Sequence, residues 1–195
     1  MVFSESSAER PARTEDVRLM QLAAQGDPRA RNMVAMRLCA RVRRVVRGLL
    51  ADPAAADDAT QDSLIEILRA AGSYRGEASL ERWADRIAVR TGLRSRRGPR
   101  RTFVPAQDLA DDASEPGLSD RLPRALTEYL GELPLEERRT LFLKHALGYT
   151  VPEIASATET ARSTVKFRLS NALSRVRKSI RRDTNIGART KAGAS

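Results

Sequence analysis

The residues best placed to do chemistry in this sequence are the basic side chains between Arg162 and Arg182. Eight Lys and Arg residues occur in this stretch, and it contains no acid. Apolar residues recur through it at helical spacing, from Val165 to Ile180, which leaves one face polar. A helix face with charge of a single sign favours contact with a polyanion, whereas the solvated face of an ordinary helical hairpin usually mixes signs.

The segment before this helix supports the same interpretation. Thr150 and Glu153 have capping-box spacing, and a short helix is expected to follow them until the polar run at Thr158. A short helix, a tight turn and a longer basic helix predict a helix-turn-helix. The side chains outside the apolar stripe are free to face a DNA groove: Arg162, Ser163, Lys166, Phe167, Ser170 and Asn171.

Few other residues could support catalysis or bind a metal. His145 is the only histidine and Cys39 the only cysteine, and each is expected to be an ordinary packed or surface residue. The motifs of nucleotide-binding loops, metalloproteases and acyl-transfer enzymes do not occur. We therefore expect no enzymatic activity, no cofactor, no metal site and no internal disulfide.

Overall charge also points to a polyanionic partner. The 195 residues include 35 Lys and Arg against 25 Asp and Glu, which gives a formal charge of +10. Nucleic acid is the leading candidate and an anionic membrane surface the second. No apolar run approaches the ~18 residues of a spanning helix, and the N-terminus has no apolar signal region, so we expect no membrane span and a cytoplasmic protein.

Helix formers dominate, strand-like alternation is absent and aromatic residues make up only 4%, so the predicted fold is all-α. Between Ala106 and Asp120 lie five acids and no base, which is typical of a linker between two domains. We expect two small helical domains joined by an acidic flexible linker. The predicted boundaries are 1–13 for a disordered tail, 14–98 for the first domain, 99–118 for the linker, 119–182 for the second domain and 183–195 for a frayed tail.

Within the first domain, the third and fourth helices carry charge of opposite sign. The third helix, after Asp52–Pro53, is acidic on its polar side and is expected to bury Leu64, Ile65 and Leu68. The fourth helix, with Ser79 as its expected cap, begins a stretch of seven arginines without an acid from Arg86 to Arg101. By themselves, an acidic face is more often solvated than a docking site, and the arginines could neutralise phosphates.

Three stretches together resemble the extracytoplasmic-function (ECF) group of the sigma-70 superfamily of bacterial RNA polymerase sigma factors. Residues 57–64, DDATQDSL, are similar to the family's acidic core-binding motif. Residues 74–88, YRGEASLERWADRIA, resemble its segment with an aromatic residue, Gly-Glu, Trp and Ile-Ala. Residues 133–148, LPLEERRTLFLKHALG, followed by EIA and TVKFRL, resemble its C-terminal helix-turn-helix domain.

This resemblance implies three binding surfaces for core RNA polymerase and promoter DNA. It also implies an anti-sigma factor as a further partner. The implied core-polymerase residues are Asp57, Asp58, Gln61 and Asp62. The implied −10 residues are Tyr74, Arg75, Glu77, Ser79, Arg86, Arg90 and Arg94. The implied −35 residues are Arg162, Ser163, Lys166, Phe167, Arg168 and Asn171. The protein is then expected to bind promoter DNA in the nucleoid of a bacterial cytoplasm.

The chain departs from the family pattern at two places. Thr158 and Glu159 stand where the turn of the helix-turn-helix usually has Leu-Gly, and Ala84, Asp85 and Arg90 replace the residues usual after Trp83. The main alternative function is a free-standing helix-turn-helix regulator, which leaves the acidic helix without a role. A basic protein that binds membrane surfaces or RNA, and a nucleic-acid-processing enzyme, are more distant alternatives.

Overall fold

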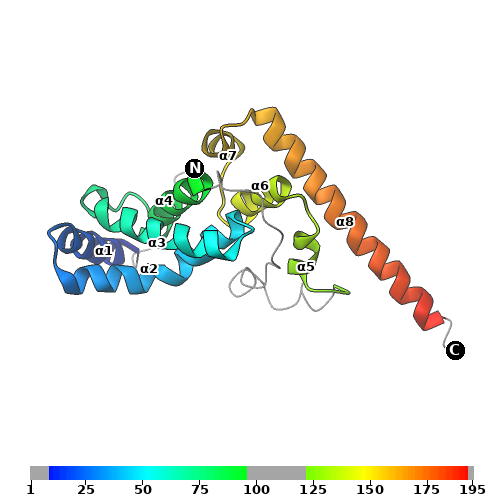
Figure 1. The fold of residues 1–195 in the computed structure, drawn as a ribbon, viewed down its shortest axis with the longest axis horizontal. Helices are drawn as coiled ribbons and strands as arrows, with labels where there is room; N and C mark the ends of the chain where they lie inside the picture. The colour runs from blue at the N-terminus through cyan, green and yellow to red at the C-terminus, as the bar shows by residue number, and fades with distance from the viewer. Residues whose placement is uncertain (1–8, 96–121, 193–195) are drawn as a thin grey trace. The chain divides into compact units, whose positions relative to one another are not determined.

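The computed structural model describes residues 9–95 and 122–192, and within them the side chains of 13–95 and 122–185. The expected linker at 99–118, the first eight residues and the last three lie outside this description. Every regular element in the described ranges is a helix, which confirms the all-α prediction (Figure 1). The elements are α1 (Glu9–Ala24), α2 (Pro28–Leu49), α3 (Pro53–Arg69), the 3₁₀ helix η1 (Ala71–Ser73), α4 (Leu80–Arg94), α5 (Leu126–Gly131), α6 (Leu135–His145), α7 (Val151–Thr158) and α8 (Arg162–Ala192).

The chain divides into two compact units. The first contains residues 1–46 and 54–98, and the second contains 47–53 and 99–195. The second unit therefore includes a short segment, 47–53, that the sequence placed in the first domain. Each unit has its own buried apolar side chains, so each is described separately below.

The helices of the first unit begin where local sequence signals predict. Gly26, with φ of +92°, reverses the chain after α1, and the Asp27 carboxylate accepts a hydrogen bond from the Ala30 N–H at 2.7 Å. Pro28 then occupies the first position of α2, where its missing N–H costs no hydrogen bond. Val34, Leu38, Val42 and Val45 form the buried stripe of α2, and Met20, Ile67 and Leu80 from α1, α3 and α4 are also buried.

Three element boundaries differ from those expected. Helix α1 begins at Glu9, inside the predicted tail, because Pro11 falls in its first turn, where a helix needs no N–H donor. Helix α8 continues to Ala192, through most of the other predicted tail. The first helix of the predicted second domain, which was placed at 119–182, is α5, and it begins only at Leu126, after Pro123, with Ala125 and Leu126 exposed.

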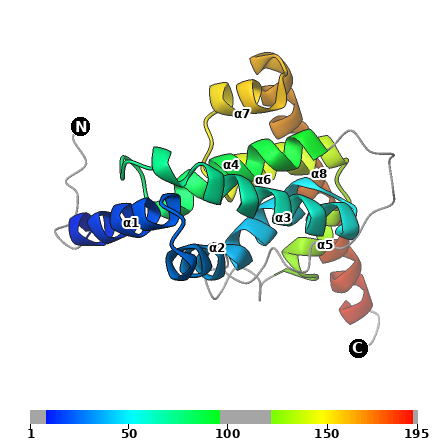
Figure 2. The same cartoon turned by 60° about the vertical axis from the view of Figure 1, so that its left-hand side comes forward.

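In the second unit, the long helix α8 is the element against which the others pack. It contacts α5, α6 and α7, and the course of α7 into α8 is visible in Figures 1 and 2. The core consists of apolar side chains from all four helices and from Leu133 in the connection between α5 and α6: Tyr129, Leu133, Leu143, Ile154, Val165 and Ala172. None of the helices in the described parts has the length and apolar run needed to cross a bilayer.

Candidate nucleic-acid interface and acidic docking face

The helix-turn-helix forms as the sequence predicts, with a complete capping box at its start. The Thr150 hydroxyl accepts from the Glu153 N–H at 3.4 Å, and the Glu153 carboxylate accepts from the Thr150 N–H at 2.8 Å. This reciprocal pair satisfies two N–H groups that the first turn of a helix leaves without partners. Helix α7 therefore has a fixed start eleven residues before α8 begins at Arg162.

The unusual turn between α7 and α8 closes without glycine. Glu159 adopts a left-handed conformation, with φ of +53° and ψ of +41°. The Thr160 N–H donates to the Ala155 carbonyl at 3.0 Å and the Glu159 N–H to the Ser156 carbonyl at 3.4 Å, which is the Schellman pattern. The Thr158 hydroxyl donates to the Ile154 carbonyl at 2.7 Å and lies 2.8 Å from the Thr160 hydroxyl. These hydrogen bonds stabilise the turn, although the left-handed backbone of Glu159 is energetically unfavourable for a residue other than glycine.

The predicted −35 residues do not all face outward. Arg162, Ser163, Lys166 and Phe167 are exposed, Phe167 to 66%, whereas Asn171 is half-buried. Arg168 is turned toward α6, where its guanidinium lies 3.2 Å from the Glu136 carboxylate and its side chain is only 23% exposed. Arg168 therefore forms an ion pair within the second unit. Ser170, two residues later, is exposed on the outer face of α8.

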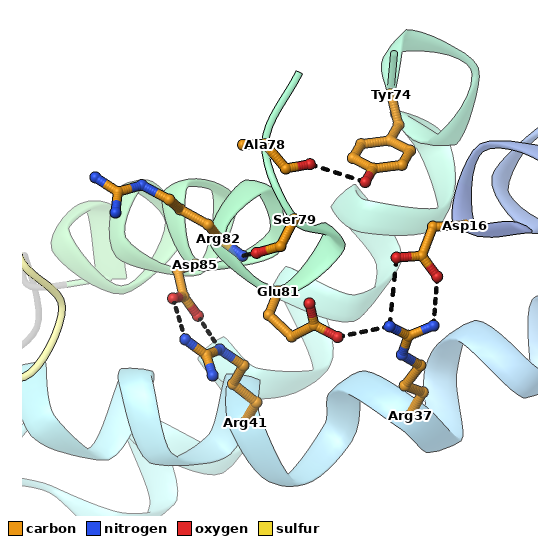
Figure 3. Close-up of polar contacts among 9 residues, drawn as sticks. All are labelled: Asp16, Arg37, Arg41, Tyr74, Ala78, Ser79, Glu81, Arg82 and Asp85. Carbon is orange, nitrogen blue, oxygen red and sulfur yellow. Dashed lines mark hydrogen bonds and ion pairs between the residues drawn. The ribbon is translucent and has the colours of Figure 1, made fainter. Parts of the chain in front are cut away.

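Tyr74, predicted to contact −10 DNA, is buried instead. Only 4% of the residue is exposed, and its ring packs edge to face on Trp83 with centroids 5.5 Å apart. Its hydroxyl donates to the Ala78 carbonyl at 2.9 Å, which closes the loop between η1 and α4 (Figure 3). Burial raises the pKa of the Tyr74 phenol. In the free chain Tyr74 is therefore the buried support of this loop, and its predicted contact with −10 DNA stays a prediction.

The other predicted −10 residues are all on the surface. Arg75, Glu77, Arg86, Arg90 and Arg94 are exposed, and so is Ser79, whose hydroxyl accepts from the Arg82 N–H at 3.3 Å as the cap of α4. Arg82 is also exposed, and it precedes Arg86 by four residues, so it belongs to the same helix face. Arg82 is not among the residues predicted to contact −10 DNA, although its spacing from Arg86 is evident in the sequence. The face of α4 formed by Arg82, Arg86 and Arg90 is called the α4 arginine face below.

Two arginines of α2 fix the position of α4 in the first unit. Arg37 lies between Asp16 of α1 at 2.5 Å and Glu81 of α4 at 2.7 Å (Figure 3). One turn later, Arg41 donates two hydrogen bonds of 2.8 Å to Asp85, which is buried. Asp85, a departure from the family pattern, therefore has a charged partner, and the paired geometry is the one that arginine and carboxylate favour.

These ion pairs shift the pKa values of their members. The hydrogen bond to Asp16 is the main cause of the raised pKa of Arg37. Burial by itself raises the pKa of Glu81, but hydrogen bonds from its own backbone N–H and from Arg37 outweigh burial and leave that pKa lowered. Both shifts favour the charged forms that hold α1, α2 and α4 together.

The acidic residues of α3 form an exposed face with an apolar residue in it. Asp57, Asp58, Gln61 and Asp62 are all exposed, as predicted. Ile65, however, was expected to be buried and is 38% exposed, because Ala56, Ala59, Thr60, Ser63 and Ile67 make up the buried side of α3. Asp58, Gln61, Asp62 and Ile65 are spaced at three and four residues, so they share one side of the helix. We call these four residues the α3 face; Asp57 lies beside it and pairs with Arg43 at 3.4 Å.

No metal centre is evident in the part of the chain that the structure describes. Within it, no three His, Cys, Asp or Glu side chains gather closely enough to hold a metal ion. His145 and Cys39 are both exposed, consistent with the surface roles expected of them.

Comparisons with known proteins match two family models to successive parts of the chain. The model of sigma-70 region 2 matches residues 35–102, and that of sigma-70, region 4 matches residues 124–176. The ECF RNA polymerase sigma factor SigM of Mycobacterium tuberculosis H37Rv is 30% identical over 165 residues, which cover 83% of this chain and 82% of that protein. The RNA polymerase sigma-H factor of Pseudomonas aeruginosa PAO1 is 25% identical over 182 residues, covering 85% and 94%.

A solved structure shares the fold. CnrH, determined in complex with the cytosolic domain of CnrY, superposes with a TM-score of 0.51 at 20% identity, covering 86% of this chain and 98% of that one. The matched regions, the similarity to SigM over most of both chains and the all-α fold lead to one conclusion. This chain belongs to the ECF group of the sigma-70 family of RNA polymerase sigma factors.

Proposed function

We propose that this chain directs promoter-specific transcription initiation by binding core RNA polymerase and the −35 and −10 elements of promoter DNA. The α3 face binds the core enzyme, the loop at residues 75–79 and the α4 arginine face bind the −10 region, and the first turns of α8 bind the −35 region. The chain has no catalytic role of its own and acts in the bacterial cytoplasm, on DNA of the nucleoid. An anti-sigma partner is also proposed, on family membership alone.

The observation that carries this proposal is the composition of the α3 face. An exposed isoleucine beside two aspartates and a glutamine fits a protein partner, because interfaces need apolar contact area at their centre and use charge for orientation. A free-standing helix-turn-helix regulator requires only the second unit and the DNA. It gives no function to an apolar residue exposed within an acidic face of the first unit.

The DNA-contacting surfaces support the proposal through their charge. Arg82, Arg86 and Arg90 present three exposed guanidinium groups along α4. Such a row suits the backbone of a separated strand, where positive charge stabilises phosphates and the cost of unstacking a base is a few kcal/mol. On α8, Lys166 and Phe167 are exposed at the end of the helix that a helix-turn-helix inserts into the major groove.

The direct test is run-off transcription with purified core polymerase on a promoter library, with and without this chain. Initiation from a defined pair of −35 and −10 elements is expected. Asp58→Arg should reduce the transcript at least tenfold, because it places a cation in an acidic interface. Glu15→Arg, the same charge change at an exposed carboxylate of α1, should leave it within twofold.

Two results would contradict the proposal. One is the absence of any start site together with failure of the chain to bind core polymerase. The other is tight, specific binding of the chain alone to a promoter duplex, with Asp58→Arg having no effect on transcription; that outcome would support the free-standing regulator.

A further inference from the structure

Helix α8 is longer than reading a DNA groove requires. Its 31 residues, at 1.5 Å per residue, span about 46 Å. The major groove of B-DNA is only about 12 Å wide, and a helix-turn-helix contacts base edges with the N-terminal residues of its recognition helix. Packing against α5 and α6 accounts for the inner side of the turns of α8 after Ser170, but neither packing nor base reading accounts for their outer side. In Figure 1 the C-terminal turns of α8 extend past α5 within the second unit.

The outer face of α8 continues without a break from its N-terminal turns into these later turns. Ser163, Phe167, Ser170 and Ser174 follow one another at spacings of four, three and four residues, and all are exposed. Arg177 and Arg181 continue the same spacing, with Lys178 beside them, and they too are exposed. Spacing of three and four residues keeps side chains on one side of a helix. From Ser163 to Arg181 this side is about 27 Å long.

The opposite side of the same turns is held by contacts within the second unit. Asp183 is the only acid of α8, and its carboxylate lies 2.7 Å from the Arg124 guanidinium. The Ser179 hydroxyl donates to the Glu132 carboxylate at 2.7 Å. Glu132 and Asp183 both pair with Arg124, whose pKa is raised chiefly by Glu132. These contacts set the rotation of α8 about its axis, so its basic side is directed outward.

The outward cations are not neutralised by the acids of the described chain. Arg177, Lys178 and Arg181 form no ion pair among the residues that the structure describes, whereas Arg182 lies 3.5 Å from Asp183. No large apolar side chain is exposed on the described part of α8 except Phe167, which lies near its start. Protein interfaces are built around apolar and aromatic anchors, and phosphate-binding surfaces are not. Charge without an apolar anchor therefore favours phosphate as the ligand.

We infer that Arg177, Lys178 and Arg181 form a second DNA-binding surface, which binds backbone phosphates of the duplex outside the groove entered by the first turns of α8. The inference rests on the proposed function, because it extends the same face of the same helix along the DNA. The surface reads no bases: it adds sequence-independent affinity and fixes the angle at which α8 enters the groove.

The test is the salt dependence of DNA binding by the full chain, measured by fluorescence anisotropy on a labelled duplex between 50 and 300 mM NaCl. The slope of log K against log salt is negative, and each lost phosphate contact reduces its magnitude by about 0.9. The variant with Arg177→Gln, Lys178→Gln and Arg181→Gln should therefore show a slope smaller in magnitude by roughly 2 to 3. Arg177→Lys with Arg181→Lys, which keeps the charge, should keep the slope of the original chain.

A matched control separates this surface from bulk charge. Arg18→Gln, Arg29→Gln and Arg69→Gln remove three exposed arginines from the first unit and should change the slope by less than about 0.3, well below the value of one phosphate contact. Circular dichroism establishes that each variant remains helical. If the α8 triple variant loses helicity, Arg181→Gln alone is measured, with an expected change of about 0.9.

An unchanged slope for the α8 variants, or an equal change in the control, would overturn the inference. Loss of core-polymerase binding with an unchanged slope would also overturn it and would assign the surface to an acidic protein. Because the duplex assay uses the chain alone, it is independent of transcription. If only this inference fails, the salt slope is unchanged in the α8 variant but the original chain still directs transcription from a defined promoter. If the proposed function fails, the original chain directs no such transcription.

Discussion

At the scale of single residues, Glu159 has the least favourable backbone of the described chain. It is the only residue other than glycine with positive φ among the described residues, at +53°. In an L-amino acid this conformation brings Cβ close to the following carbonyl oxygen and costs roughly 1–2 kcal/mol, a cost that glycine avoids. The turn nevertheless forms, because its hydrogen bonds and the packing of Val165 and Ile154 hold it.

Glu159→Gly should therefore stabilise the protein, raising its free energy of unfolding by about 1 kcal/mol. Ser174→Gly, at an exposed position inside α8, should instead lower it by about 0.5 kcal/mol. Urea unfolding followed by circular dichroism measures both. If both glycine variants shift the urea midpoint in the same direction, the change in stability of Glu159→Gly does not come from relief of backbone strain.

Tyr74 is buried in the free chain, and its side chain supports the loop before α4. Tyr74→Phe removes only the hydroxyl that donates to the Ala78 carbonyl. The expected cost is about 1 kcal/mol of unfolding free energy, with the preference for −10 sequences unchanged. The measurements are urea unfolding and run-off transcription on promoters with altered −10 elements. A changed −10 preference at unchanged stability would restore the direct role predicted for this residue.

At the scale of elements, the positions of α1, α2 and α4 depend on ionised carboxylates. Arg37 joins α2 to Asp16 of α1 and to Glu81 of α4. Glu81 has a lowered pKa in the folded state, so over the acidic range the unfolded chain binds more protons at this position. Its stabilising contribution is therefore complete above its unfolded pKa of about 4.3 and is lost as the pH falls through the lower folded value.

Glu81→Gln should make unfolding free energy less dependent on pH below about pH 5. Above that range the variant should be less stable than the original chain, because the charged partner of Arg37 is gone. Glu15→Gln, at an exposed position of α1, should keep the original pH profile. The measurement is the urea midpoint of each protein from pH 3 to pH 7. Parallel curves for Glu81→Gln and the original chain would contradict the predicted contribution of Glu81 to the pH dependence of stability.

At the scale of the whole molecule, surfaces of opposite charge are expected to bind different partners. The exposed acids of α3 lie in the first unit and the exposed reading face of α8 lies in the second. Sites in separate units that share no partner side chains usually contribute independently to binding. The two functions should therefore be separable by substitution.

Asp62→Arg should abolish core-polymerase binding while leaving the affinity of the chain alone for duplex DNA within twofold. Lys166→Ala should do the reverse: core binding is retained, and the contribution of the −35 element to transcription falls several-fold. A pull-down with core enzyme and anisotropy on duplex DNA measure the two functions. Loss of both in either variant would show that the surfaces are coupled.

The sequence by itself determined whatever depends on near neighbours along the chain. Helical periodicity, the Asp27 and Ser79 caps and the capping box at Thr150 were all predictable, because each involves residues at most four positions apart. The all-α fold, the helix-turn-helix and the acidity of α3 followed from the same local patterns. The family resemblance added an expected role to each surface.

Only the tertiary structure decided which polar and aromatic side chains turn inward. Arg168 meets Glu136, Asp85 meets Arg41 and Tyr74 meets Trp83, and these contacts join different helices or a loop and a helix. Ile65 is exposed because the buried side of α3 is centred on Ala56, Ala59, Ser63 and Ile67. Periodicity alone does not reveal which apolar residue lies at the edge of a buried stripe. Helix α8 continues beyond its predicted end while Asp183 pairs with Arg124, 59 positions away along the chain. Pairing at that separation depends on how the helices pack, and no local pattern in the sequence encodes it.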